Sequence, residues 1–369
     1  MGGVAIFHDN FAQMGGAERV AEALTEALPG ATLHTTLAEP SILVPALRAR
    51  PIRTTWMQRL PAPGRLYRHY FLLYPFAVES VDLRRYDLVV SSCFGYAKGV
   101  HTRSDAVHVC YCYTPMRWVW RHDDYVGRER FSRLQRAAIA CAMPLLRRWD
   151  LHAARQPDYF LTSSAVVAAR IRACYGRDAV VIPPPVDVSR FRATEPRGDY
   201  DLVVSRLSAY KRLDLAVAAC TALGRRLVVI GDGPDRGRLE ALAGPTVRFL
   251  GRQPDQVVAD ALAGCRALIF PGEEDFGIAP LEAHASGRPV VALRGGGATE
   301  TVIDGETGVF FDTPTVDALA DALRRLDAGA WEPARLRRHA EGYDRPVFVS
   351  RIRRFLHDVA GVAADTGVH

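Results

Sequence analysis

Lysine is scarce in this sequence of 369 residues, and so are clusters of basic residues. Only two of its 47 basic residues are lysines, and the arginines are spread along the chain. The net charge of +6 is therefore weak evidence for a nucleic-acid partner, and we expect none. No run of about 18 apolar residues occurs, so we predict no transmembrane helix, and any membrane contact should be peripheral.

Cysteine patterns that form metal sites or disulfide frameworks are also lacking. The seven cysteines are an odd number, and they form no pair of CxxC motifs. Such a set is typical of a reducing compartment, so we expect a cytoplasmic protein. The chain begins MGGVAIFHDN, without the basic start and the long apolar core of a secretory signal.

Short apolar runs alternate with amphipathic segments along the first half of the chain. Strands are predicted at 4–7, 86–92, 106–113 and 158–164, and helices at about 17–28 and 165–175. This alternation indicates βα units in a doubly wound parallel sheet. Residues 50–80, rich in proline, aromatic residues and arginine, are expected to form irregular helices, or alternatively a lid that contacts a ligand or a membrane.

A second alternating region follows the proline-rich linker VIPPPVDVSRF at 181–191. Its expected strands are YDLVVSRL, RRLVVIGDG, TVRFLG, RALIFPG, RPVVAL and TGVFF. We therefore predict an α/β protein with two Rossmann-like domains, 1–190 and 191–345, and a C-terminal helix within 346–369 that packs back on the first domain. Parallel sheets bind ligands beyond the carboxyl ends of their strands, so two facing sheets imply a ligand cleft between the domains.

The stretch FPGEEDFGIAPLEAHASGRPVVA at 270–292 predicts a strand, a turn and a helix. Gly277 permits a tight turn, the helix is expected at about 278–286, and Gly287 supplies its stop. Pro280 falls in the first helical turn, where its missing N–H costs little. The carboxylates before the helix can cap it, but the same N-terminus can also bind an anion.

Backbone and charged groups of this stretch fit a ligand that carries both phosphate and sugar. The N–H groups of Gly277, Ile278 and Ala279 can cradle an anion. A carboxylate beside a diphosphate is unfavourable unless it faces hydroxyl groups. We therefore expect Glu274 and Glu282 to face the hydroxyl groups of the ligand.

Two further segments contribute groups that suit phosphates. Arg206 ends the first strand of the second domain and Lys211 follows five residues later, where both cations can neutralise a diphosphate without a metal. Gly15 and Gly16 lie between the first strand and its helix, where backbone can approach a phosphate closely. A plain tight turn is the alternative for the two glycines.

The order GGAERV, SRL with a nearby lysine, EEDFGIAPLEA, GRPVVA and GGATETV resembles the family 4 glycosyltransferases of GT-B fold. The resemblance implies retaining transfer of a hexose from a nucleoside diphosphate sugar to a hydroxyl acceptor, with no metal or other cofactor. It implies that Arg206 and Lys211 hold the donor diphosphate, Glu282 the ribose and Glu274 the transferred sugar. The expected donor site is completed by Gly15, Gly16, Leu250, Gly251, Arg252, Phe276, Gly277, Ile278 and Ala279.

The segment CYCYTPMRWVW at 110–120 resembles a subgroup of bacterial mannosyltransferases of O-antigen and exopolysaccharide synthesis. Tyr113 takes the place of a histidine that supports developing positive charge in that subgroup, and it can still donate a hydrogen bond. The subgroup implies Tyr113 as a catalytic residue and GDP-mannose as donor, with UDP- or dTDP-sugars as alternatives. The acceptor would be a glycan, a glycolipid or a small molecule.

Two alternative functions stay open at this point. One is a catalytically weakened GT-B protein that binds a nucleotide sugar, and the other is a GT-B nucleotide-sugar epimerase. The motif DYD at 199–201 precedes a strand, and GDGPDR at 231–236 lacks the third glycine of a dinucleotide fingerprint. We therefore expect neither a metal site at the first motif nor NAD at the second.

Overall fold

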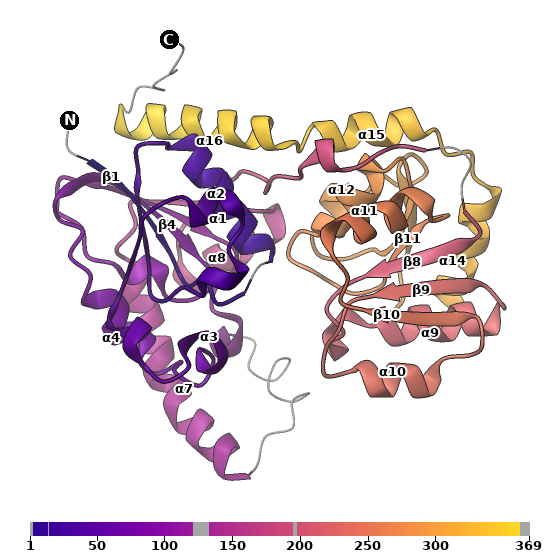
Figure 1. The fold of residues 1–369 in the computed structure, drawn as a ribbon, viewed down its shortest axis with the longest axis horizontal. Helices are drawn as coiled ribbons and strands as arrows, with labels where there is room; N and C mark the ends of the chain where they lie inside the picture. Colours follow the sequence, from indigo (N-terminus) through magenta and orange to yellow (C-terminus); the bar gives the residue numbers. More distant parts are fainter. Residues whose placement is uncertain (1–2, 14, 121–132, 195–197, 362–369) are drawn as a thin grey trace. The chain divides into compact units, whose positions relative to one another are not determined.

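The computed structural model describes residues 3–13, 15–120, 133–194 and 198–361. The chain forms two compact units (Figure 1). Unit 1 runs from Met1 to Pro185 and includes the C-terminal segment from Pro346, and unit 2 runs from Val186 to Arg345. Among the described residues, no helix combines the length and the apolar character needed to cross a membrane.

Unit 1 is built around a seven-stranded parallel sheet with the order β3-β2-β1-β4-β5-β6-β7. The strands are β1 (Gly3–His8), β2 (Thr32–Thr35), β3 (Ile52–Thr54), β4 (Tyr86–Cys93), β5 (Val107–Cys112), β6 (Tyr159–Thr162) and β7 (Ala179–Val181). The four strands with long apolar runs are confirmed. The sequence analysis missed β2, β3 and β7, which are only three or four residues long.

Helices surround this sheet. They are α1 (Gly16–Ala27), α2 (Pro45–Arg48), α3 (Pro63–Leu66), α4 (Tyr74–Glu79), α5 (Arg117–Trp120), α7 (Arg133–Ala153), α8 (Ala165–Tyr175) and α16 (Arg345–Ala360), with short 3₁₀ turns η1 (Pro40–Ile42), η2 (Trp56–Arg59) and η3 (Ala97–Gly99). The expectation of only irregular helices over 50–80 was wrong, because β3 adds an edge strand to the sheet there. The helical part of that expectation is confirmed by α3 and α4.

Both faces of the unit 1 sheet are buried. Along β1, Ala5 and Phe7 pack in one hydrophobic cluster, whereas Ile6 packs in another. Successive side chains of a strand point to opposite faces, so these clusters cover the two faces of the sheet. Burial on both sides explains why the strands of this sheet read as continuous apolar runs.

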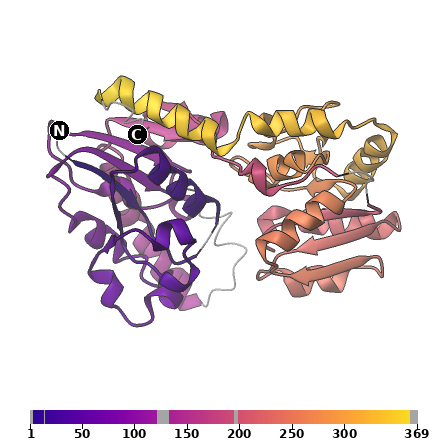
Figure 2. The ribbon, with the colours of Figure 1, turned by 45° about the horizontal axis from the view of Figure 1, so that its top comes forward.

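Helix α16 completes the second of these clusters. Phe348, Ile352 and Leu356 recur every four residues, and each is at most 2% exposed. The Arg353 guanidinium also donates to the carbonyl oxygens of Glu26 and Ala27 at the end of α1. Figure 2 shows α16 lying along unit 1, so the last described helix packs on the N-terminal sheet.

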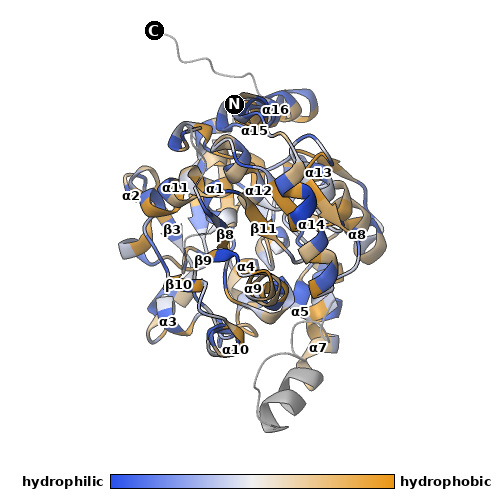
Figure 3. Cartoon of the chain, turned by 90° about the vertical axis from the view of Figure 1, so that its right-hand side faces the viewer, coloured by the Kyte–Doolittle hydropathy of each residue, from blue (hydrophilic) through white to orange (hydrophobic). Residues whose placement is uncertain are grey.

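Unit 2 contains a six-stranded parallel sheet with the order β10-β9-β8-β11-β12-β13. Its strands, all expected from the sequence, are β8 (Tyr200–Val204), β9 (Arg226–Ile230), β10 (Val247–Gly251), β11 (Leu268–Phe270), β12 (Val290–Leu293) and β13 (Gly308–Phe311). Its helices are α9 (Leu213–Ala222), α10 (Arg236–Leu242), α11 (Asp255–Gly264), α12 (Ile278–Ala285), α13 (Ala298–Thr301), α14 (Val316–Ala328) and α15 (Pro333–Glu341), with turns η4 (Val188–Arg190) and η5 (Ala209–Lys211). Figure 3 shows the buried strand β11 in the hydrophobic colour.

The strand order reverses once in each sheet. In unit 1 the reversal lies between β1 and β4, and in unit 2 it lies between β8 and β11. Ligands of open α/β sheets bind beyond the carboxyl ends of the strands at such a reversal. We therefore expect functional residues in the segments that follow these four strands.

Candidate functional site

The segments that follow β8 and β11 meet in unit 2. Lys211 lies at the end of η5, and Glu274 lies in the turn between β11 and α12. The Lys211 ammonium forms an ion pair with the Glu274 carboxylate, and their side chains are only 13% and 22% exposed. Water screens a partly buried pair less than a surface pair, so the attraction between the two groups is stronger than in an exposed ion pair.

The β11 segment must pass close to the backbone of η5. A Cβ atom at Gly272 would lie 2.6 Å from the Lys211 carbonyl oxygen, so only glycine fits there. Arg212, directly after Lys211, adopts the left-handed conformation with φ of 52°. This conformation is uncommon outside glycine, and it turns the chain from η5 into α9.

Two consecutive glycines, Gly296 and Gly297, hold the segment that carries Glu274. The Gly297 N–H donates to the Glu274 carbonyl oxygen at 2.8 Å. A Cβ atom at Gly296 would lie 2.2 Å from that same oxygen, and one at Gly297 would lie 2.2 Å from the Cα of Phe276. The GGATETV motif therefore supports the Glu274 turn by close backbone contact, a role that the sequence analysis did not assign.

The GDG sequence at 231–233 supports the β8 segment in the same way. A Cβ atom at Gly231 would lie 1.9 Å from the Ser205 carbonyl oxygen, and one at Gly233 would lie 2.3 Å from the Leu207 carbonyl oxygen. The Leu207 N–H donates to the Asp232 carbonyl oxygen at 3.0 Å. These glycines thus position the backbone on both sides of Arg206.

Helix α12 has the ends that the sequence predicts. Gly277 has φ of 90° and precedes the helix, and Gly287 has φ of 69° just after it. Pro280 is the third helical residue, so the backbone N–H groups of Ile278 and Ala279 form the start of the helix. This start follows directly on the turn that carries Glu274, and an anion is favoured there.

The other predicted donor residues of unit 2 lie around these loops. Arg206 is exposed directly beyond β8, and Glu282 is half-buried on α12. Leu250 and Gly251 end β10, two strands away from β8, and Arg252 follows exposed. The Gly251 carbonyl oxygen accepts a hydrogen bond of 2.8 Å from the Gly231 N–H, which ties the β10 end to the GDG turn. The structure thus joins Lys211 to Glu274 directly, and the donor role of all these residues, Lys211 and Glu274 included, stays a prediction.

In unit 1, one carboxylate ties the segments beyond β1 and β4 together. The buried Asp9 side chain accepts hydrogen bonds of 2.5 to 2.8 Å from the N–H groups at positions 94, 95, 96 and 97. Burial raises the pKa of Asp9, and these N–H groups act in the opposite direction. Asp9 therefore satisfies the backbone of the turn that begins η3.

A chain of hydrogen bonds beside this turn includes Tyr113. The Tyr113 hydroxyl donates to the Ala17 carbonyl oxygen at 2.8 Å, and it pairs at 2.8 Å with the Ser92 hydroxyl. Since the tyrosine donates to the carbonyl, Ser92 donates to the tyrosine and accepts from His8 Nδ1 at 2.9 Å. Burial lowers the pKa of His8 to about 3 and raises that of Tyr113 far above its usual value, so both are neutral. Tyr113 thus anchors the first turn of α1, and its catalytic role stays a prediction.

Glu18 occupies the predicted glycine turn of unit 1. The Gly15 N–H donates to the Glu18 carboxylate at 2.8 Å, and α1 begins at Gly16. Glu18 is only 1% exposed, and burial raises the pKa of its carboxyl group to about 7. The spacing of three residues between Gly15 and Glu18 matches a capping box, which is the signal that could have identified this contact.

The motif DYD at 199–201 takes part in ion pairs within unit 2. Buried Asp201 pairs with Arg225 at 2.7 Å, and Asp199 pairs with Arg226 on the neighbouring strand β9. Within the described ranges, no group of three or more His, Cys, Asp or Glu side chains could hold a metal ion. All seven cysteines are unpaired thiols.

Comparison with known proteins identifies the family. The model described as Glycosyltransferase Family 4 matches residues 14–190, and the model described as Glycosyl transferases group 1 matches residues 189–342. The chain belongs to the family 4 glycosyltransferases. Its two parallel α/β sheets are those of the GT-B fold.

Named relatives agree with this family. The chain is 35% identical over 196 residues to a GDP-mannose-dependent alpha-(1-6)-phosphatidylinositol monomannoside mannosyltransferase of Mycolicibacterium smegmatis, covering 44% of this chain and 51% of that protein. It is 29% identical over 244 residues to a D-inositol 3-phosphate glycosyltransferase of Actinosynnema mirum, covering 57% and 58% of the two chains. The chain spans about half the length of the curated relatives it matches.

A solved structure shares the whole fold. The crystal structure of HepE from Anabaena in complex with UDP and glucose aligns with a TM-score of 0.71 and 17% identity, covering 97% of this chain and 100% of that one. At this identity the match shows a common GT-B architecture.

The glycine contacts of the Glu274 turn lead to a first prediction. Gly305 has φ of 75°, and a Cβ atom added there would have no neighbour within 4 Å. Gly305→Ala should therefore lower the free energy of unfolding only by the strain of the left-handed conformation, about 1 kcal/mol. Gly296→Ala, at φ of 56°, should lower the free energy of unfolding by at least about twice that amount, since its Cβ also meets the Glu274 carbonyl oxygen. Urea unfolding of both variants measures the difference, and equal losses would contradict the close contact.

A second prediction concerns the buried carboxyl of Glu18. Its pKa rises from an ordinary 4.5 to about 7 on folding, so the folded protein binds this proton more tightly than the unfolded chain. The stabilisation that this proton contributes should therefore be lost as pH rises from 4.5 to 7, so the free energy of unfolding falls over that range. Above it, the effect of Glu18 should stay constant. Urea unfolding of the wild type and of Glu18→Gln across this range should show a difference that changes with pH. A difference that is independent of pH would show that burial does not shift this pKa.

Proposed function

We propose that this protein is a retaining, metal-independent glycosyltransferase that moves a hexose from a nucleoside diphosphate sugar to a hydroxyl acceptor. The observation that supports this most strongly is the ion pair of Lys211 and Glu274, in the turn that leads into α12. It places a cation, a carboxylate and a helix N-terminus where the strand order of unit 2 reverses.

Each of these groups has a role in sugar transfer. Departure of the nucleotide leaves negative charge on the β-phosphate, and Lys211 and Arg206 would stabilise that charge together with the start of α12. The two cations can supply this charge stabilisation without a metal. Because close contacts with glycines set the backbone that carries these cations, little backbone reorganisation would be needed as the charge develops.

The carboxylates would position the donor. Glu274 holds Lys211 before the donor binds, and it would then accept hydrogen bonds from hydroxyl groups of the transferred sugar. Glu282, one helical turn into α12, would bind the ribose. The acceptor hydroxyl would attack from the face that the nucleotide leaves, and the departing phosphate would accept its proton, so the anomeric configuration would be retained.

GDP-mannose is the donor that we favour. The mannosyltransferase relative named above is GDP-mannose-dependent, and the HepE crystal structure holds UDP and glucose. UDP- and dTDP-sugars are therefore the alternatives to test. The acceptor would be a glycan, a glycolipid or a hydroxylated small molecule.

A second candidate is a catalytically weakened member of the family that binds a nucleotide sugar. The engaged hydroxyl of Tyr113 favours it, because the proton of that hydroxyl is already donated to Ala17. Such a protein would bind the donor without measurable transfer or hydrolysis. A turnover assay with each nucleotide sugar therefore separates the two candidates.

The transferase reading predicts a kinetic defect in Lys211→Ala. Removal of one preorganised stabiliser of a developing anion should lower kcat by roughly 10² to 10³. Arg226→Ala is a matched control. Arg226 is an exposed cation of the same unit, lies at the start of β9 and forms an ion pair with Asp199. In steady-state kinetics, the control should have a kcat near that of the wild type. An unchanged kcat in Lys211→Ala would exclude Lys211 from the mechanism.

A further inference from the structure

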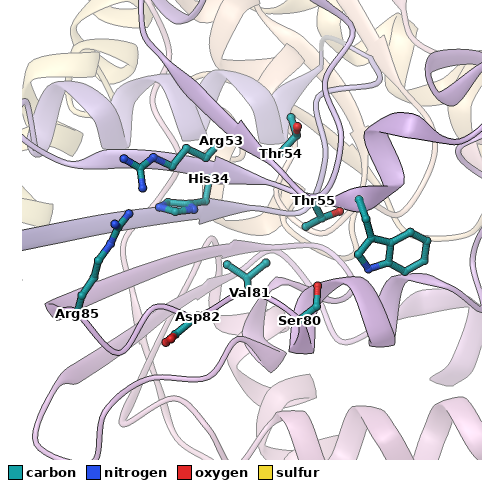
Figure 4. Close-up of a pocket in the computed structure, with 9 residues that line it drawn as sticks. His34, Arg53, Thr54, Thr55, Ser80, Val81, Asp82 and Arg85 are labelled. Carbon is teal, nitrogen blue, oxygen red and sulfur yellow. The ribbon is translucent and has the colours of Figure 1, made fainter.

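Unit 1 contains a cavity of about 530 Å³ away from the segments described above (Figure 4). Its lining includes His34, Arg53, Thr55, Trp56, Ser80 and Arg85. These residues come from β2, from the edge strand β3 with the start of η2, and from the segment that joins α4 to β4. In the sheet order, β3 lies two strands from β1, so the cavity is distinct from the turn that holds Asp9.

The charge that lines this cavity is positive. Arg53 and Arg85 both line it, and no carboxylate of the described residues pairs with either guanidinium. Asp82 is the one acidic side chain of the lining, and its carboxylate accepts hydrogen bonds of 3.0 and 3.3 Å from Arg84. Two guanidinium groups without a counter-ion favour an anion, above all one that accepts paired hydrogen bonds.

Contacts position the Arg85 guanidinium, and the sheet register places Arg53 beside His34. Arg85 donates to the Tyr86 hydroxyl at 2.7 Å and lies 4.8 Å from the centre of that ring. Arg53 is the direct cross-strand partner of His34, so both side chains are on one face of the sheet. His34 is buried, and burial together with Arg85 lowers its pKa to about 4, so the imidazole adds no positive charge. Figure 4 shows both guanidinium groups on the His34 side of the cavity.

The other side of the cavity carries an aromatic ring and hydroxyl groups. Trp56 is 40% exposed and presents a flat apolar surface. The hydroxyls of Thr55 and Ser80 donate to the carbonyl oxygens of Thr36 and Ala77. The Thr55 oxygen also accepts from the Met57 N–H at 3.2 Å, so the Ser80 oxygen is the better placed of the two to accept a hydrogen bond from a ligand. An anion site next to an aromatic surface and acceptor hydroxyls suits a ligand with a charged group on a hydroxylated ring.

We propose that this cavity binds a phosphate group attached to a hydroxylated ring. The guanidinium groups of Arg53 and Arg85 bind the phosphate, and the ring lies against Trp56. This site does not depend on the transfer reaction proposed for unit 2.

A soluble sugar phosphate and a phospholipid headgroup share this chemistry. Phe76 on α4 lies one helical turn before Ser80, which caps that helix, and Phe76 is 67% exposed, so an exposed apolar side chain lies near the cavity for an acyl chain to contact. The experiment must therefore offer the phosphate in both forms.

The test is a binding measurement on the full chain with two probes. Glucose 1-phosphate is titrated by calorimetry, with glucose as the uncharged reference, and vesicles that contain phosphatidylinositol are compared with pure phosphatidylcholine vesicles by co-sedimentation. The variant is Arg53→Gln, on an exposed edge strand where folding should not depend on the charge. Arg59→Gln is the matched control, since it removes an exposed arginine of η2 outside the lining.

At least one probe should bind the wild type, and Arg53→Gln should weaken that binding by about tenfold while Arg59→Gln leaves it unchanged. Loss of glucose 1-phosphate binding identifies a soluble ligand, and loss of vesicle binding identifies a lipid headgroup. Equal effects of the two variants, or no binding of either probe, would overturn the proposal. Nucleoside diphosphate binding, measured in the same variants, should stay at the wild-type level, so failure of the donor site is seen separately.

Discussion

The ion pair between Lys211 and Glu274 is the interaction on which the site in unit 2 depends. It joins the segments that follow the two central strands, β8 and β11, at the point where the strand order reverses. Each partner lies on backbone that can only take its path because glycines approach it within van der Waals distance. Main-chain packing thus sets the backbone of both partners, and the ion pair holds the ammonium, so a donor diphosphate would meet a site that is already formed.

In unit 1, the two segments that follow the strands at the reversal of strand order are joined by hydrogen bonds instead of an ion pair. The Asp9 carboxylate accepts hydrogen bonds from four backbone N–H groups. A series of hydrogen bonds that starts at His8 and ends with the Tyr113 hydroxyl holds the first turn of α1. Desolvation keeps His8 and Tyr113 neutral, so this network contributes hydrogen bonds rather than charge. Positive charge lies instead at the edge of the sheet, in the cavity lined by Arg53 and Arg85.

The sequence predicts the elements that local pattern determines. All six strands of unit 2 and both ends of α12 follow from apolar runs and from glycine and proline positions. The strand β3 was missed because three residues on a sheet edge carry too little pattern. The support of Glu274 by Gly296 and the pairing of Tyr113 with Ala17 were missed because the contacting residues are distant in the sequence. Periodicity cannot indicate such contacts, and they appear only when the sheet order is known.

The central claim is that unit 2 binds a nucleoside diphosphate by Lys211, Arg206 and the start of α12 without a metal. Calorimetric titration of the full chain with GDP, UDP and dTDP, first in a chelator and then with magnesium, tests it most directly. The account predicts that one of these nucleotides binds with the same affinity in both conditions. Binding of none of them, or binding only when magnesium is present, would contradict it.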